Sequence, residues 1–184
     1  MNKSAFILLR FGAAGIPFLF SVIVPFLISP SSTSVLFYNL SRLAILSSIL
    51  KLGMDTYILR RKDLAENSFV VSIMFLIQSL LIGLIMITVG CQLYEVFGAI
   101  LFSMLIIWGA LELSLGHRLK SLMPVLFLFY PILLIILVFF TNIDGLMLAL
   151  IISFIIYMPF LSKRTGEISK SDFKNYFNRE YLWL

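Results

Sequence analysis

The chain has 184 residues, of which 61% are hydrophobic and only 12% are charged, and its mean hydropathy is +1.07. This composition leaves too little polar surface to coat a water-soluble globule, so it excludes a soluble protein and predicts an exterior that faces lipid. The formal charge of +5 would fit a nucleic-acid partner. The basic residues, however, stand one to three at a time between long apolar runs, which favours membrane orientation over nucleic-acid binding.

The first apolar segment is expected at about residues 5–28, with Lys3 and Arg10 near its start. This is the charge order of a secretion signal, but no small-x-small cleavage site precedes Ser31, so we expect a first span that is retained. The turn 29–32, with the sequence Ser-Pro-Ser-Ser, separates it from the second segment.

Five further spans are expected, at about residues 35–59, 69–93, 96–115, 122–140 and 145–161. The last three spans are joined by connections so short that consecutive helices among them should be antiparallel neighbours. The predicted fold is therefore all-α, a polytopic membrane bundle of six transmembrane helices over residues 1–162. Residues 163–184 form a cytoplasmic tail or a linker, and the length leaves no room for a separate soluble domain.

The distribution of Lys and Arg between the loops supports this order of spans and orients it. The turns on one side, near Ser31, Tyr94 and Asn142, hold no basic residue. This predicts that both termini lie in the cytoplasm of a bacterial cell, with the chain in the inner membrane. The other side carries Lys3, Arg10, Arg60, Arg61, Lys62, Arg118, Lys120, Lys163, Arg164, Lys170, Lys174 and Arg179.

Three ionisable residues interrupt the second span: Arg42, Lys51 and Asp55. Each costs about 2.5–3.5 kcal/mol at the centre of a membrane helix on insertion scales, so each should face a cavity or a partner. Lys51 and Asp55 are most simply an i,i+4 ion pair, and the alternative is the lining of a water-filled path. Arg42 has no acidic residue within two turns, so a functional role is favoured and its partner must come from elsewhere. It points about 180° away from Lys51, so one groove cannot easily contain both cations.

Glu112 lies at the end of the fourth span, within reach of Arg118 or Lys120 at the following bend. An interfacial salt bridge is the simpler expectation, and a proton-coupling role is the alternative. Three uncharged polar residues of the spans are expected to bond between helices rather than to a ligand. They are Asn39, Ser41 and Gln78.

The sequence offers no catalytic constellation and no metal site. Cys91 is the only cysteine and His117 the only histidine, and no carboxylates pair inside the bundle. We therefore expect neither an enzyme nor a cofactor.

The segment from Ser29 to Arg60 resembles the polysaccharide flippases of the multidrug and oligosaccharidyl-lipid exporter superfamily. In those proteins the second helix commonly closes with a Leu-Gly-Leu/Met-Asp run that ends in arginine, here Leu52, Gly53, Met54, Asp55 and Arg60. The resemblance implies one six-helix lobe of a two-lobe transporter of undecaprenyl-pyrophosphate-linked oligosaccharide. It also implies a cationic cavity in which Arg42 and Lys51 would neutralise pyrophosphate or acidic sugars. Family members are about twice this length, so we expect a fragment, a truncated product or a half that needs a second lobe or a homodimer partner.

Two other functions remain open at this stage. One is a non-transporting membrane subunit that holds polysaccharide enzymes at the membrane, in which Arg42 pairs with an acidic residue of a different protein. The other is half of a proton- or sodium-coupled antiporter for small molecules, with Asp55 or Glu112 as the coupling group.

Overall fold

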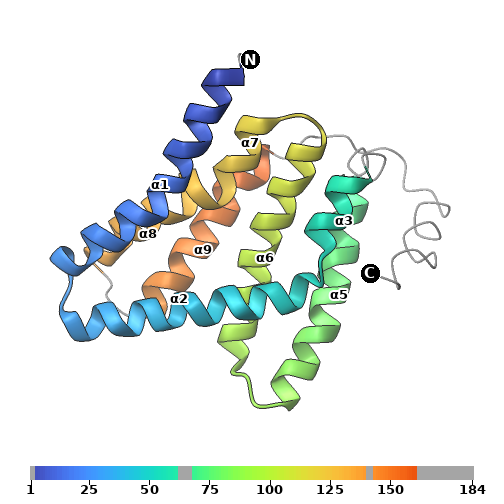
Figure 1. Cartoon of the computed structure of the whole chain (residues 1–184). Coiled ribbons are helices and arrows are strands. Elements are labelled where there is room, and N and C mark those ends of the chain that lie inside the picture. The colour runs from blue at the N-terminus through green and yellow to red at the C-terminus, as the bar shows by residue number, and fades with distance from the viewer. Residues whose placement is uncertain (1–2, 62–67, 140–142, 161–184) are drawn as a thin grey trace.

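The computed structural model describes residues 3–61, 68–139 and 143–160, and every element in these ranges is a helix (Figure 1). The predicted tail from residue 163, the turn near Asn142 and the cation Lys62 lie outside the described residues. The α-helices are α1 Lys3–Leu27, α2 Pro30–Lys51, α3 Met54–Arg60, α5 Ser68–Thr88, α6 Leu93–Ser114, α7 Arg118–Leu122, α8 Tyr130–Leu137 and α9 Ile143–Tyr157. A π-helix, η1, covers Met123–Phe129 and a 3₁₀ turn, η2, covers Met158–Phe160.

Four helical stretches are long and apolar enough to cross a membrane, judged by length and composition: Pro30–Lys51, Ser68–Thr88, Leu93–Ser114 and Arg118–Leu137. Two further apolar stretches, Gly15–Leu27 and Gly145–Tyr157, are shorter. Many large apolar side chains are exposed on these helices. An apolar exterior of this kind indicates a membrane protein. The count of six spans stays a prediction.

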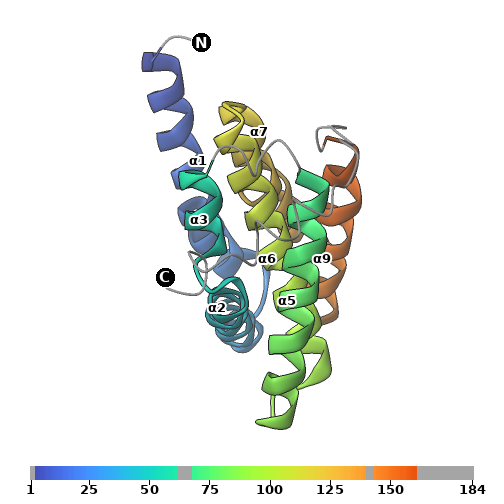
Figure 2. The ribbon, with the colours of Figure 1, turned by 90° about the vertical axis from the view of Figure 1, so that its right-hand side faces the viewer.

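The helix α6 lies at the centre, in contact with α2, α3, α5, α7, η1 and α9 (Figure 2). Glycines on α6 let its neighbours come close. A Cβ atom on Gly98 would lie 2.9 Å from the sulfur of Met147 on α9, and one on Gly109 would lie 2.8 Å from the backbone oxygen of Ser121 on α7. Small residues at such contacts are the usual means of close helix packing in membranes.

The second predicted span is not one continuous helix. It breaks at Leu52 and Gly53, which adopt left-handed backbone angles with φ of 45° and 76°. Glycine takes this conformation without strain and leucine does not. The amide of Gln78 on α5 donates to two carbonyls at the end of α2, those of Leu50 at 3.2 Å and Lys51 at 3.4 Å. The break is thus held by a side chain from another helix, which confirms the expectation that Gln78 bonds between helices.

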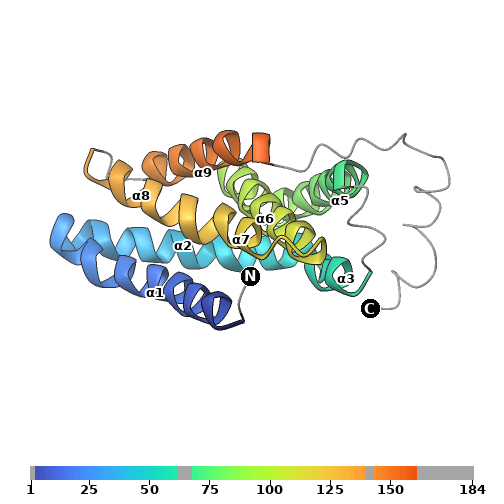
Figure 3. The same cartoon turned by 90° about the horizontal axis from the view of Figure 1, so that it is seen from above.

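Because of this break, α2 and α3 point in different directions. In Figure 1, α2 runs across the view while α3, α5 and α6 rise steeply, and in Figure 2 α2 is seen almost end-on. Helix α2 crosses α6, whereas the pieces of the last three predicted spans are neighbours in chain order, α6 with α7 and α8 with α9. Helices α5 and α6 form a hairpin, and α1 contacts η1 and α8 (Figure 1). Seen from above, α1 and α2 run along the same side of the molecule (Figure 3).

The fifth predicted span consists of three pieces, α7, η1 and α8. Pro124 and Pro131 lack an amide hydrogen, so the i→i−4 ladder cannot run unbroken through this region. In its place the amide of Tyr130 donates to the carbonyl of Val125, five residues earlier. The result is a wide turn between two ordinary helices, a feature that often marks a functional site.

The contact of Gly109 with Ser121 predicts a measurable packing effect. Gly109→Ala places a methyl group against a backbone oxygen that cannot rotate away, so we expect the free energy of unfolding to fall by about 1–3 kcal/mol. The measurement is chemical unfolding of the purified protein in mixed micelles. Gly15→Ala is the matched control, because a Cβ atom there meets nothing within 4 Å. Equal stability of the two variants would contradict the close contact.

Candidate functional site

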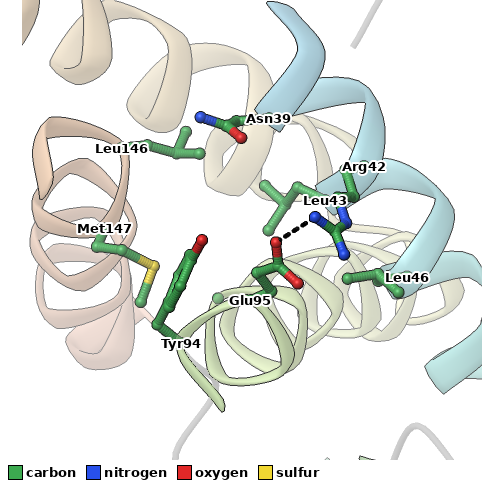
Figure 4. A pocket seen from close by; sticks show the side chains of 9 residues that line it. Asn39, Arg42, Leu43, Leu46, Tyr94, Glu95, Leu146 and Met147 are labelled. Atoms are coloured by element: carbon green, nitrogen blue, oxygen red, sulfur yellow. Dashed lines mark ion pairs between the residues drawn. The ribbon is translucent and has the colours of Figure 1, made fainter. Parts of the chain in front are cut away.

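Arg42 of α2 forms an ion pair with Glu95 in the first turn of α6. Arg42 Nη1 lies 2.6 Å from Glu95 Oε1, and the two side chains point toward each other across the helix crossing (Figure 4). The arginine side chain is 38% exposed and the glutamate side chain 7%. Glu95 Oε2 accepts a hydrogen bond from the backbone amide of Gln92 at 3.2 Å. Both carboxylate oxygens are therefore engaged, and Glu95 joins the start of α6 to α2.

The pocket around this pair is small. Its volume is about 20 Å³, which is enough for about one water molecule. Asn39, Tyr94 and Met147 are among its lining residues (Figure 4). The pocket cannot hold a sugar or a lipid headgroup in this conformation. Arg42 therefore lies where α2, α6 and α9 pack together around a small pocket.

Lys51 and Asp55 form the second ion pair, across the break between α2 and α3. Lys51 Nζ lies 3.1 Å from Asp55 Oδ2, with exposed fractions of 13% and 29%. Asp55 Oδ1 accepts a hydrogen bond from the amide of Thr56 at 2.9 Å. The predicted pair is present, although it bridges two helices rather than one turn of a single helix.

Asp55 also borders a large, open cavity between α3, α6, α7 and η1. Its volume is about 560 Å³, within the range of pockets that hold drug-sized ligands. Arg118, at the start of α7, is the other charged lining residue. The remaining lining is apolar apart from Ser121. Lys51 is not among the lining residues, but it forms an ion pair with Asp55, which is one of them.

Glu112 is buried near the end of α6, with 1% of its side chain exposed. Its Oε2 atom lies 3.9 Å from Lys120 Nζ on α7 and has no hydrogen-bond partner. The hydroxyl of Tyr157 donates to the backbone oxygen of Lys120 at 3.2 Å, which brings α9 to the same place. Of the two expected partners, the structure pairs Glu112 with Lys120, and the contact is long.

The structure does not bring the predicted site residues together. Arg42 and Lys51 lie in separate ion pairs, one at the start of α6 and one at the break after α2, as their opposite faces suggested. One residue that the sequence interpretation did not single out is Glu95, the partner of Arg42, whereas Arg118, expected beside Glu112, lines the large cavity. A signal for Glu95 was present, since a Gln-x-x-Glu spacing at residues 92–95 is typical of a capped helix start.

Other expected roles have mixed outcomes. Asn39 lines the small pocket and Ser41 is exposed. The part of the chain that the structure describes holds no group of three His, Cys, Asp or Glu side chains that could bind a metal ion.

Comparisons of the chain with known protein families, with curated proteins and with solved structures find no match. The function must therefore be argued from the geometry and from the motif at the α2–α3 break.

The unequal burial of Arg42 and Glu95 predicts unequal effects of removing each. Arg42→Gln leaves a buried carboxylate without its cation, so we expect the free energy of unfolding to fall by about 1–3 kcal/mol. Glu95→Gln leaves an arginine that can reach water or headgroups, so the fall should be smaller. A double-mutant cycle in mixed micelles should give a coupling energy of about 0.5–3 kcal/mol. Ser41→Ala, an exposed change on the same helix, is the control, and strictly additive effects would show that the pair contributes nothing.

Proposed function

We propose that the chain is one lobe of a bacterial membrane transporter that moves undecaprenyl-pyrophosphate-linked oligosaccharide, such as an O-antigen unit, across the inner membrane. The proposal includes six membrane spans, cytoplasmic termini, and a second lobe or a second copy that completes the transport path. The all-helical fold and its apolar exterior are compatible with such a lobe. The motif from Leu52 to Arg60 supplies the family resemblance.

One observation carries the proposal: an apolar helix breaks beside an open cavity, and an ion pair bridges the break. Irregular backbone at membrane depth is tolerated where it is buried in protein or lines a cavity. Transporters commonly use discontinuous helices of this kind at their substrate sites. Lys51 and Asp55 stand at this break, and Asp55 faces the cavity.

Substrate capture in this lobe would be an exchange of partners. Both candidate cations are neutralised by carboxylates, Arg42 by Glu95 and Lys51 by Asp55. A pyrophosphate group carries more negative charge than a carboxylate, and it can displace one from an ammonium or guanidinium group. Rocking of the two lobes would then expose the bound headgroup to the other leaflet.

Deletion of the gene in its own cell tests the proposal. We expect loss of surface polysaccharide and accumulation of the lipid-linked oligosaccharide on the cytoplasmic side, both measured by extraction and gel analysis. Lys51→Gln should reduce export by about tenfold, the cost of one charge-assisted contact, whereas Lys51→Arg should retain it. Unchanged surface polysaccharide after deletion would refute the proposal.

A charge swap separates cargo binding from a structural role of the same pair. The double variant Lys51→Asp, Asp55→Lys keeps an ion pair across the break, so the protein should accumulate to its normal level in the membrane. Export should remain low, because the cation has moved to the other helix. Full export from this variant would show that the pair serves only to hold α2 and α3.

A second candidate function, proton-coupled antiport, is favoured by the state of Glu112. A carboxylate that is 99% buried and lacks a hydrogen bond on one oxygen is costly to keep charged. The groups facing it are Lys120 of α7 and Tyr157 of α9, with His117 in the adjoining turn.

This second function makes its own prediction. Acid-driven efflux of a cationic dye from proteoliposomes should depend on Glu112 and disappear in Glu112→Gln, with His117→Gln as the matched control. An efflux rate that equals that of empty liposomes at every pH would exclude it.

A further inference from the structure

The large cavity has walls that suit a hydrocarbon chain. Its apolar lining comes from four elements and includes Leu59 of α3, Leu105 and Leu113 of α6, Leu122 of α7, and Val125 and Leu126 of η1. Leu59 and Leu113 are themselves partly exposed, 42% and 39%, so the cavity is open to the surroundings of the protein. In a chain with an apolar exterior, an open space with leucine walls is filled more favourably by hydrocarbon than by water.

One basic residue, Arg118, lines this cavity, and a second, Arg60, lies at the same end of the molecule. The hydroxyl of Ser114 donates to the carbonyl of Ile58 at 3.3 Å, so the end of α3 lies beside the end of α6. This contact brings exposed Arg60, at the end of α3, to the same end of the molecule as Arg118, which is exposed and lines the cavity. Asp55 is the opposing charge in the lining, and Lys51 neutralises it. With Asp55 already paired to Lys51, Arg118 is the side chain of the lining that can contact an anion.

We propose that this cavity binds one anionic phospholipid of the bilayer. An acyl chain lies along the leucine and valine side chains of α6 and η1, and the phosphate lies at Arg118. Basic pockets between membrane helices are general binding sites for anionic lipid headgroups. The site goes beyond the proposed transport function, because the occupant is a resident lipid and not the cargo.

The shape of the site depends on the π-helix. Val125 and Leu126 belong to η1, and Ser121, at the end of α7, is held against Gly109 on α6. Val125 and Leu126 of this wide turn line the cavity together with Leu105 of α6. An occupant in that space would contact α3, α6 and η1 at once and would stabilise their arrangement.

The test uses the full chain, purified in detergent and freed of lipid. Dioleoyl phosphatidylglycerol and dioleoyl phosphatidylcholine are titrated separately and counted on the protein by native mass spectrometry. The two lipids have the same acyl chains, so any preference reports the headgroup. We expect one tightly bound phosphatidylglycerol, preferred over phosphatidylcholine by about fivefold for each basic residue at the phosphate.

Three variants assign the binding to this cavity. Ala110→Phe places a ring inside it and should abolish the tight site, since Ala110 is a buried lining residue. Arg118→Gln should keep chain binding but lose the preference for phosphatidylglycerol. Ala44→Phe, the same change at an exposed position of α2, should behave as the wild type.

A crosslinking experiment on the unchanged chain removes the dependence on how the variants fold. Phosphatidylglycerol with a diazirine in its acyl chain should label the lining residues of α6 and η1. Labels spread evenly over the exterior, or equal binding of the two phospholipids, would overturn the proposal. Displacement of the label by a polyprenyl-linked oligosaccharide would also overturn it, because the cavity would then belong to cargo. That last result would overturn the lipid site but not the transport function. The transport function is tested separately, by the loss of export on gene deletion.

Discussion

In an apolar chain, every polar atom needs a partner within the protein, and α6 provides many of these partners. Glu95 pairs with Arg42, and the hydroxyl of Ser103 donates to the carbonyl of Ser47 at 3.2 Å. Further along, Ser114 bonds to α3 and Glu112 faces α7. The glycines of the same helix let these contacts form, because they bring the neighbouring backbones within reach. The arrangement of α2, α3 and α7 follows from the order of these side chains along α6.

The sequence predicted the helices well, because long apolar runs leave little choice of structure where water is scarce. It did not predict the break after Lys51. Glycine is common in membrane helices, so Gly53 did not mark a break. The side chain that holds the break, Gln78, lies 28 residues from Leu50 and 27 residues from Lys51, whose carbonyls it binds. The partner of Arg42 was missed for a similar reason. Glu95 lies beyond two whole helices in the chain, and no local periodicity connects it with α2.

Both candidate substrate-binding cations, Arg42 and Lys51, are paired with carboxylates of the same chain. A cavity lined by free arginine and lysine would attract any anion, whereas Arg42 and Lys51 each already contact a carboxylate. In the proposed transporter, a ligand would bind only if its phosphate competed with that carboxylate, so the ion pairs would select for strongly charged headgroups. The non-transporting scaffold hypothesis placed the partner of Arg42 in another protein, and the structure places a partner in the same chain.

The large cavity and the buried carboxylate of Glu112 both border α7. The close contact between Gly109 and Ser121 holds α7 against α6. Tyr157 of α9 contacts α7 through its hydrogen bond to the backbone oxygen of Lys120. Lys120 is also the residue that faces Glu112. Any movement of α7 that widens or closes the cavity therefore changes the distance between Lys120 and a carboxylate with 1% of its side chain exposed. Occupancy of the cavity and the separation of Lys120 from Glu112 are thus physically coupled through α7.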